Sequence, residues 1–270
     1  MSSARVAALQ MISGGNVAGN LQVAEALIAD AAGRGASLLV LPEAFACYDS
    51  EQSAALGAAE RFADGPLRCF LAAQARRHRV FLVGGTIPIT GADALPRAAC
   101  LLYGPDGAEL ARYDKLHLFD VDLPDAQRCY RESAFYAPGA EVVSALTPCG
   151  LLGLAVCYDL RFPEMYRRYA LAGADLLLVP SAFTYTTGQA HWELLVRTRA
   201  VENQAYVAAP AQGGVHENGR RTWGHSMAVD PWGVILSERA EGEGVDVVEL
   251  ELSRLQQVRL QLPALEHRVL

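Results

Sequence analysis

The chain has 270 residues, of which 51% are apolar and 20% are charged, and its formal net charge is -7. This amount of apolar material is sufficient for one large core, so we expect a single domain over residues 1–270. The acidic balance excludes an extended phosphate-binding surface and hence a nucleic-acid partner, and no apolar run approaches the roughly 20 residues that cross a membrane.

Hydrophobic periodicity and turn signals predict strands and helices in mixed order. The predicted strands cover residues 6–11, 37–41, 79–84, 98–103, 109–113, 142–146, 151–156, 174–179, 205–209, 225–230, 234–237 and 244–250. The predicted helices cover residues 20–32, 66–78, 163–172 and 190–203, followed by a terminal helix with Ser253 as its cap. Strand–helix units interspersed with hairpins indicate an α/β protein with two sheets that each face helices, rather than one doubly wound sheet.

Two further features concern loops and cysteines. Residues 116–138 show weak periodicity and many polar side chains, and a loop of this length in a compact domain is usually functional. The six cysteines include no Cys-x-x-Cys pair, and the N-terminal segment lacks the basic and apolar regions of a signal peptide. We therefore expect free thiols and a cytoplasmic location.

Cys157 is the first candidate for chemistry. It follows an apolar strand and precedes the segment that opens the helix at Pro163. This setting predicts a sulfur exposed at the sheet edge, close to helical N–H groups that lower the pKa of a thiol. The alternative is an ordinary buried cysteine at the end of a strand.

Three charged residues could complete a site for acyl transfer around this sulfur. Glu43 follows Pro42 at the end of an apolar strand and could serve as a general base, whereas a surface acid is the alternative. Lys115 ends a hairpin strand and could stabilise an oxyanion, whereas a solvated charge is the alternative. Glu132 lies late in the 116–138 loop and could orient Lys115; its alternative is a salt bridge within the loop.

The segments around these residues resemble the three signatures of the nitrilase superfamily, the carbon–nitrogen hydrolases. They are residues 41–43 (LPE), 113–120 (YDKLHLFD) and 153–164 (GLAVCYDLRFPE). Later segments extend the resemblance over essentially the whole chain: residues 180–183 (PSAF), 188–193 (GQAHWE), 199–206 (RAVENQAY) and 224–233 (GHSMAVDPWG).

This resemblance implies a four-layer α-β-β-α sandwich and a Glu43–Lys115–Cys157 triad, with Glu132 as an assisting second glutamate. It implies hydrolysis of a linear amide through a thioester, with the backbone N–H of Tyr158 as a second oxyanion donor. It also implies a homodimer or a higher homo-oligomer, with no metal and no cofactor.

Within the family, the later segments and residues 211–216 (AQGGVH) resemble the branch that acts on deaminated glutathione, with 2-oxoglutaramate as the alternative substrate. The expected substrate-binding residues are Tyr158, Phe183, Thr184, His191 and Arg161. Arg161 and Arg199 are candidate anchors for the substrate carboxylate, and ion pairs with Asp159, Glu164 or Glu202 are the alternative for both arginines.

Other functions fit less well. His191 and Glu193 open a zinc deaminase pattern, but no Pro-Cys-x-x-Cys follows. His117, His216 and His225 lack a partner at metal-ligand spacing, and Ser226 lacks the last glycine of a nucleophile elbow. A nitrilase proper and a non-catalytic binding protein of the same fold are the remaining alternatives.

Overall fold

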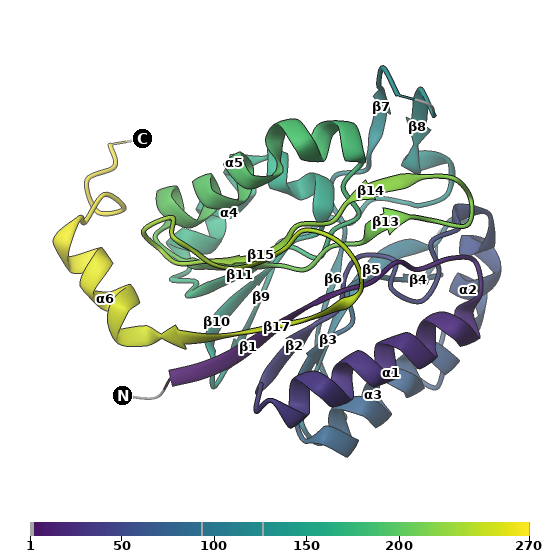
Figure 1. The fold of residues 1–270 in the computed structure, drawn as a ribbon, viewed down its shortest axis with the longest axis horizontal. Coiled ribbons are helices and arrows are strands. Elements are labelled where there is room, and N and C mark those ends of the chain that lie inside the picture. The colour runs from purple at the N-terminus through teal and green to yellow at the C-terminus, as the bar shows by residue number, and fades with distance from the viewer. Residues whose placement is uncertain (1–2, 93, 126, 270) are drawn as a thin grey trace.

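The fold has four layers, as the resemblance implied. The computed structural model describes residues 3–92, 94–125 and 127–269. Two β-sheets pack face to face, and helices cover the outer face of each sheet (Figure 1). The predicted α-β-β-α sandwich is therefore confirmed.

The first sheet combines a parallel centre with antiparallel edges. Its order is β17 (Gly244–Glu251), β1 (Ser3–Gln10), β2 (Leu38–Val40), β3 (Phe81–Val83), β5 (Arg97–Tyr103) and β4 (Ile87–Ile89), with β6 (Glu109–Asp114) also paired to β5. The helices α1 (Val17–Gly33) and α3 (Pro66–His78) cover its outer face (Figure 1). Strands β1, β2 and β3 run parallel, because α1 and the segment containing α3 provide the crossovers between them.

The second sheet repeats this arrangement. Its order is β16 (Ile235–Arg239), β15 (Ser226–Val229), β12 (Tyr206–Ala209), β11 (Leu176–Leu178), β10 (Gly150–Leu154) and β9 (Val143–Thr147). The helices α4 (Pro163–Leu171) and α5 (Tyr185–Asn203) cover its outer face, and α6 (Leu252–Gln261) extends away from the sandwich near the C-terminus (Figure 1).

Side-chain alternation along the strands builds two cores. On β2, Leu38 and Val40 belong to the core shared with the second sheet, whereas Leu39 belongs to the core beneath α1 and α3. All three side chains are fully buried, because a central parallel strand is covered on both faces. This burial explains why the strand is an apolar run without polar alternation.

Several elements differ from the predictions. Ser253 lies inside α6 rather than at its cap, which is Glu251. Helix α5 begins at Tyr185 rather than at residue 190, because the Thr184 side chain accepts a hydrogen bond from the Thr187 N–H and caps the helix. The sequence reading missed several short elements: α2 (Ser53–Ala59), β4, the hairpin of β7 (Asp120–Asp122) and β8 (Cys129–Arg131), and the hairpin of β13 (Gly213–Val215) and β14 (Arg221–Trp223).

The part of the chain that the structure describes also contains three 3-10 helices: η1 (Ser50–Gln52), η2 (Glu132–Ala134) and η3 (Cys157–Arg161). Two of them begin at a residue that the sequence singled out. Among the described residues, no helix combines the length and the apolar character needed to cross a membrane.

Candidate active site

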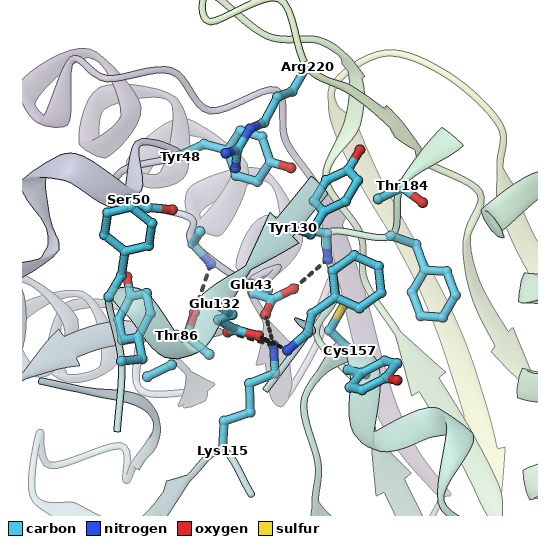
Figure 2. A pocket seen from close by; sticks show the side chains of 18 of the residues that line it. Glu43, Tyr48, Ser50, Thr86, Lys115, Tyr130, Glu132, Cys157, Thr184 and Arg220 are labelled. Atoms are coloured by element: carbon cyan, nitrogen blue, oxygen red, sulfur yellow. Dashed lines mark hydrogen bonds and ion pairs between the residues drawn. The ribbon is translucent and has the colours of Figure 1, made fainter. Parts of the chain in front are cut away.

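Glu43, Lys115 and Cys157 converge where strands of the two sheets end. Glu43 follows β2, Lys115 directly follows β6, and Cys157 opens η3 just after β10. Their side chains meet in one pocket (Figure 2). The sequence separates these residues widely, so the packing of the two sheets creates the cluster.

Lys115 lies between two carboxylates. Its Nζ is 2.8 Å from Oε1 of Glu43 and 2.8 Å from each carboxylate oxygen of Glu132. The lysine is only 2% exposed. A buried ammonium requires such partners, because an unpaired charge in this position would be strongly destabilising.

The backbone also fixes these charges. The Lys115 N–H donates to the Ala98 carbonyl at 3.0 Å, and the Gly139 N–H donates to the Lys115 carbonyl at 2.8 Å. Glu132 opens η2, and its Oε2 accepts a hydrogen bond from the Phe119 N–H at 2.6 Å. The 116–138 loop therefore carries the second carboxylate to the lysine.

Glu43 is held by the opposite sheet. Its Oε2 accepts a hydrogen bond from the Ala182 N–H at 2.7 Å, and its backbone carbonyl accepts one from the Gln212 side chain at 3.1 Å. The next residue, Ala44, has a left-handed conformation with φ of 54° and donates its N–H to Oγ1 of Thr86 at 2.9 Å. The carboxylate is thereby aimed at Cys157 (Figure 2).

Cys157 occupies a strained turn. Its φ is 47°, a left-handed value that costs a non-glycine residue about 1–3 kcal/mol and is concentrated at functional sites. Its N–H donates to the Pro180 carbonyl at 3.0 Å. Tyr158 is the second residue of η3. The first hydrogen bond within this helix runs from the Asp159 N–H to the Val156 carbonyl, so the helix does not use the Tyr158 N–H.

A buried carboxylate supports this turn from beneath. Asp159 is fully buried and accepts hydrogen bonds from the Val156 N–H at 2.8 Å and the Tyr113 hydroxyl at 2.7 Å. It also contacts the ring of His117, which stacks on Phe162 with centroids 3.7 Å apart. These contacts fix the position of the residue that carries the sulfur.

The electrostatics differ from the expectation of an acidic thiol. Burial raises the pKa of the Cys157 thiol well above its usual value, the Glu43 carboxylate raises it further, and Lys115 lowers it. Burial also raises the pKa of Glu132, although the Lys115 charge lowers it. Burial lowers the pKa of Lys115, but the two carboxylates outweigh burial and the pKa is raised. The resting site thus pairs a neutral thiol with an adjacent carboxylate that can accept its proton.

The cavity around the sulfur has a volume of about 140 Å³ and is lined by three of the five predicted substrate-binding residues. Tyr158, Phe183 and Thr184 line it together with Glu43, Lys115, Glu132 and Cys157. Cys157 lines this cavity, so a small molecule bound in it could reach the sulfur.

Arg161 and His191 are not among the residues that line the cavity. The Arg161 guanidinium lies 5.3 Å from the centroid of the ring of Phe183, which does line it, and its Nη1 is 3.3 Å from Nδ1 of His191. Arg199 makes an ion pair with Glu202 at 2.6 Å, which was the alternative interpretation of that residue.

The sequence reading missed several residues of the cavity, notably Tyr48, Tyr136 and Arg220. Arg220 follows the Asn218–Gly219 turn between β13 and β14. An Asn-Gly pair is a strong hairpin signal and could have located this hairpin, although it could not have shown that the hairpin reaches the cavity. Among the described residues, no cluster of His, Cys, Asp or Glu could hold a metal ion.

The family model described as Carbon-nitrogen hydrolase matches residues 5–260. The chain belongs to this family. Its resemblance in sequence thus extends through both sheets and most of α6.

Two curated relatives of this carbon–nitrogen hydrolase carry different activity names. The chain is 46% identical to deaminated glutathione amidase of Synechocystis sp., an alignment that covers 97% of both chains. It is 38% identical to omega-amidase NIT2 of Danio rerio, covering 99% of this chain and 95% of the relative. Among solved structures, the NitFhit protein of C. elegans superposes with a TM-score of 0.92 at 37% identity, over 100% of this chain and 66% of the longer protein.

Proposed function

We propose that this carbon–nitrogen hydrolase is a cysteine-dependent amidase that cleaves a linear amide through a thioester intermediate. The observation that carries the proposal is the contact of one buried lysine with two carboxylates beside a strained cysteine, inside one cavity. The names of the curated relatives support the reaction class.

In the first half of the reaction, the Cys157 sulfur attacks the amide carbonyl while its proton passes to Glu43. Lys115 and the Tyr158 N–H stabilise the oxyanion, and one such donor typically contributes about 2.7–4 kcal/mol of transition-state stabilisation. Glu43 then delivers the proton to the amine nitrogen as the C–N bond breaks. The amine departs and leaves an acyl thioester on the sulfur.

In the second half, water attacks the thioester and gives its proton to Glu43. The C–S bond breaks, the carboxylic acid departs, and the thiol recovers its proton. The raised pKa of the thiol suits this cycle, because the sulfur starts and ends protonated. Glu132 acts through Lys115 as a positioning residue, since both of its oxygens contact the lysine.

The preferred substrate is deaminated glutathione, which would release 2-oxoglutarate and cysteinylglycine and make the enzyme a metabolite-repair amidase. The identity of 46% to a relative with that name favours it. The second candidate is 2-oxoglutaramate, which would release ammonia. The 38% identity to omega-amidase NIT2 supports this candidate. Tyr158, Phe183 and Thr184 would contact the substrate, because they line the cavity.

Intact-protein mass spectrometry tests the mechanism. When the protein is mixed with either amide and quenched, we expect a mass increment of one acyl group that is located on Cys157. The matched control Cys157→Ala should show no increment and should lose at least ~10³-fold in kcat. Undiminished turnover by this variant would refute the covalent mechanism.

Product analysis separates the two substrates, because they share one acyl group and differ only in the amine. The preferred substrate is supported if deaminated glutathione releases cysteinylglycine at a higher kcat/KM than 2-oxoglutaramate releases ammonia. The reverse order supports the omega-amidase reaction. Faster turnover of a nitrile than of any amide would instead favour a nitrilase.

We also propose that the chain is one hydrolase domain over residues 1–270 and that it acts as a cytoplasmic homodimer or higher homo-oligomer. Exposed apolar side chains on α5 and the β15–β16 turn support the assembly: Leu194 is 66% exposed and Trp232 is 52% exposed.

A further inference from the structure

Arg220 lies where the cavity opens to an outer groove. It lines both spaces, together with Ser50 and Tyr130. Its side chain extends from the β13–β14 hairpin toward Tyr48 (Figure 2). A ligand bound at the sulfur and extending outward would therefore pass this guanidinium.

The charge of Arg220 is not neutralised by an ion pair among the described residues, whereas the other cations of the cavity are paired. Lys115 contacts both Glu43 and Glu132. Arg131 donates two hydrogen bonds to the Asp122 carboxylate at 2.9 and 3.0 Å. A planar guanidinium without a carboxylate is suited to bind one from a ligand, because its N–H groups match both carboxylate oxygens.

Two of the three acids that line the groove, Asp49 and Asp125, are bound to their own loops. Asp49 accepts hydrogen bonds from the Glu51 N–H at 3.1 Å and the Gln52 side chain at 3.1 Å. Asp125 accepts bonds from two backbone N–H groups of its loop and from the Tyr130 hydroxyl at 2.9 Å. These bonds direct both acids toward their loops and leave the guanidinium open to the groove.

Tyr48 adds a neutral donor beside the cation. Burial raises the pKa of its phenol, while the Arg220 charge lowers it and the Glu43 charge raises it. The ring packs on His216 with centroids 4.1 Å apart, and His216 is itself bonded to Ser13 and Thr222. Tyr48 thus lies within the field of both the proposed base and Arg220, in a fixed position.

We infer that Arg220, assisted by the Tyr48 hydroxyl, binds a carboxylate group of the amide substrate and so selects anionic amides. The inference rests on the proposed amidase function, since the amide carbonyl must lie at Cys157. Such a carboxylate can belong to the acyl part or to the departing amine, and matched substrates distinguish the two positions.

Two pairs of amides isolate the carboxylate. Glutaramate and pentanamide have the same acyl chain, which ends in a carboxylate in the first and a methyl group in the second. N-pentanoylglycine and N-ethylpentanamide differ in the same way on the amine side. The kcat/KM of each compound is measured for the native protein, Arg220→Gln, Arg220→Lys and the neighbouring control Arg221→Gln, whose guanidinium lies 3.6 Å from the centroid of the Tyr185 ring.

For the anionic member of one pair, we expect Arg220→Gln to lower kcat/KM by about 10–100-fold through KM, the loss typical of a charge-assisted hydrogen bond. The neutral member should change less than about twofold, and Arg220→Lys should restore part of the loss. An effect on glutaramate assigns the carboxylate to the acyl part, and an effect on N-pentanoylglycine assigns it to the amine.

Equal losses for anionic and neutral amides, or an equal effect of Arg221→Gln, would overturn the inference. Glutarate binding by calorimetry is a readout that needs no turnover. The native protein should bind glutarate at least about tenfold more tightly than Arg220→Gln; equal affinities also overturn the inference. If the native protein binds glutarate in this way yet hydrolyses neither the four amides nor the two proposed substrates, the proposed function fails and the anion site stands.

Discussion

At the scale of single residues, Lys115 is the structural centre of the site. It separates two carboxylates, the buried Glu43 and the partly buried Glu132, that would otherwise face each other. We expect Lys115→Met to lower the free energy of unfolding by about 3–5 kcal/mol, because two acids are left without their cation. Urea unfolding monitored by fluorescence measures this loss.

The double variant Lys115→Met/Glu132→Gln is the matched control. It removes one of the two negative charges and should recover part of the lost stability. Its kcat should remain about 10²–10³-fold below that of the native protein, because the oxyanion donor is still missing. Equal stabilities of the single and double variants would contradict this account of the site.

The same charges set the dependence of activity on pH. The pKa of Glu132 is raised by burial and by Glu43, so this acid becomes protonated at a pH above the usual range of a carboxyl group. Protonation removes the charge that holds Lys115, and activity should therefore fall on the acid side through this raised pKa. Lys115 stays charged well into the alkaline range, because its own pKa is raised.

Measured pH profiles of kcat/KM check this prediction. We expect an acid limb above about pH 4.3, the ordinary value for glutamate, and no loss from Lys115 up to about pH 10. In Glu132→Gln, activity is lower and the acid limb is shifted or lost, because the carboxyl group with the raised pKa has been removed. An unchanged limb in this variant would assign the titration to another group.

The sequence predicted these residues better than it predicted the substrate contacts. Cys157 and Glu43 follow apolar strands, so their local patterns place them at sheet ends. Arg161 is close to Cys157 in sequence, but its guanidinium packs on the ring of Phe183 and is not among the groups that line the cavity. Arg220 approaches from a distant hairpin, and a contact of this kind depends on tertiary packing that no local pattern encodes.

At the scale of elements, the segment after β3 supports the segment that carries Glu43. Gly85 has a φ of 46°, and a Cβ there would lie 1.9 Å from the Pro42 carbonyl oxygen. We expect Gly85→Ala to reduce stability by roughly 1–3 kcal/mol and to lower kcat, because the backbone beside Glu43 must shift. Thermal unfolding and steady-state kinetics measure the two effects.

Gly91→Ala is the matched control, since a Cβ at Gly91 would meet no atom of the described residues within 4 Å. Both stability and kcat should stay close to those of the native protein in this variant. If Gly85→Ala behaved in the same way, the close approach to Pro42 would have no role in holding the base.

Element prediction succeeded where side-chain periodicity was strong and failed where elements were short. The helix over residues 66–78 was predicted with the observed bounds, because Pro66 marks its first turn and Arg79 ends it in a left-handed conformation. The three-residue strands β4, β7 and β13 carry too few residues to show a period. Their pairing depends on partners that are distant in space rather than on their own sequence.

At the scale of the whole molecule, the exposed apolar surface of α5 predicts association of two copies. Leu194 is 66% exposed and Val201 is 47% exposed on this helix. We expect Leu194→Glu to shift the protein toward the monomer in sedimentation velocity, because a buried interface does not tolerate an unpaired carboxylate.

Leu146→Glu provides the comparison, because Leu146 is 79% exposed on β9, away from α5. It introduces the same charge and should leave the sedimentation coefficient unchanged. A monomeric native protein, or dissociation by the β9 variant alone, would contradict the proposed interface.

The hydrogen bonds of Glu43 to Ala182 and Gln212 have a consequence for refolding. They join the end of β2 to segments of the other sheet, so the base has its position only after both sheets have docked. During refolding from denaturant, recovery of hydrolysis should therefore lag behind the regain of secondary structure. A fragment that contains only the first half of the chain would retain Glu43 and Lys115 and yet remain inert.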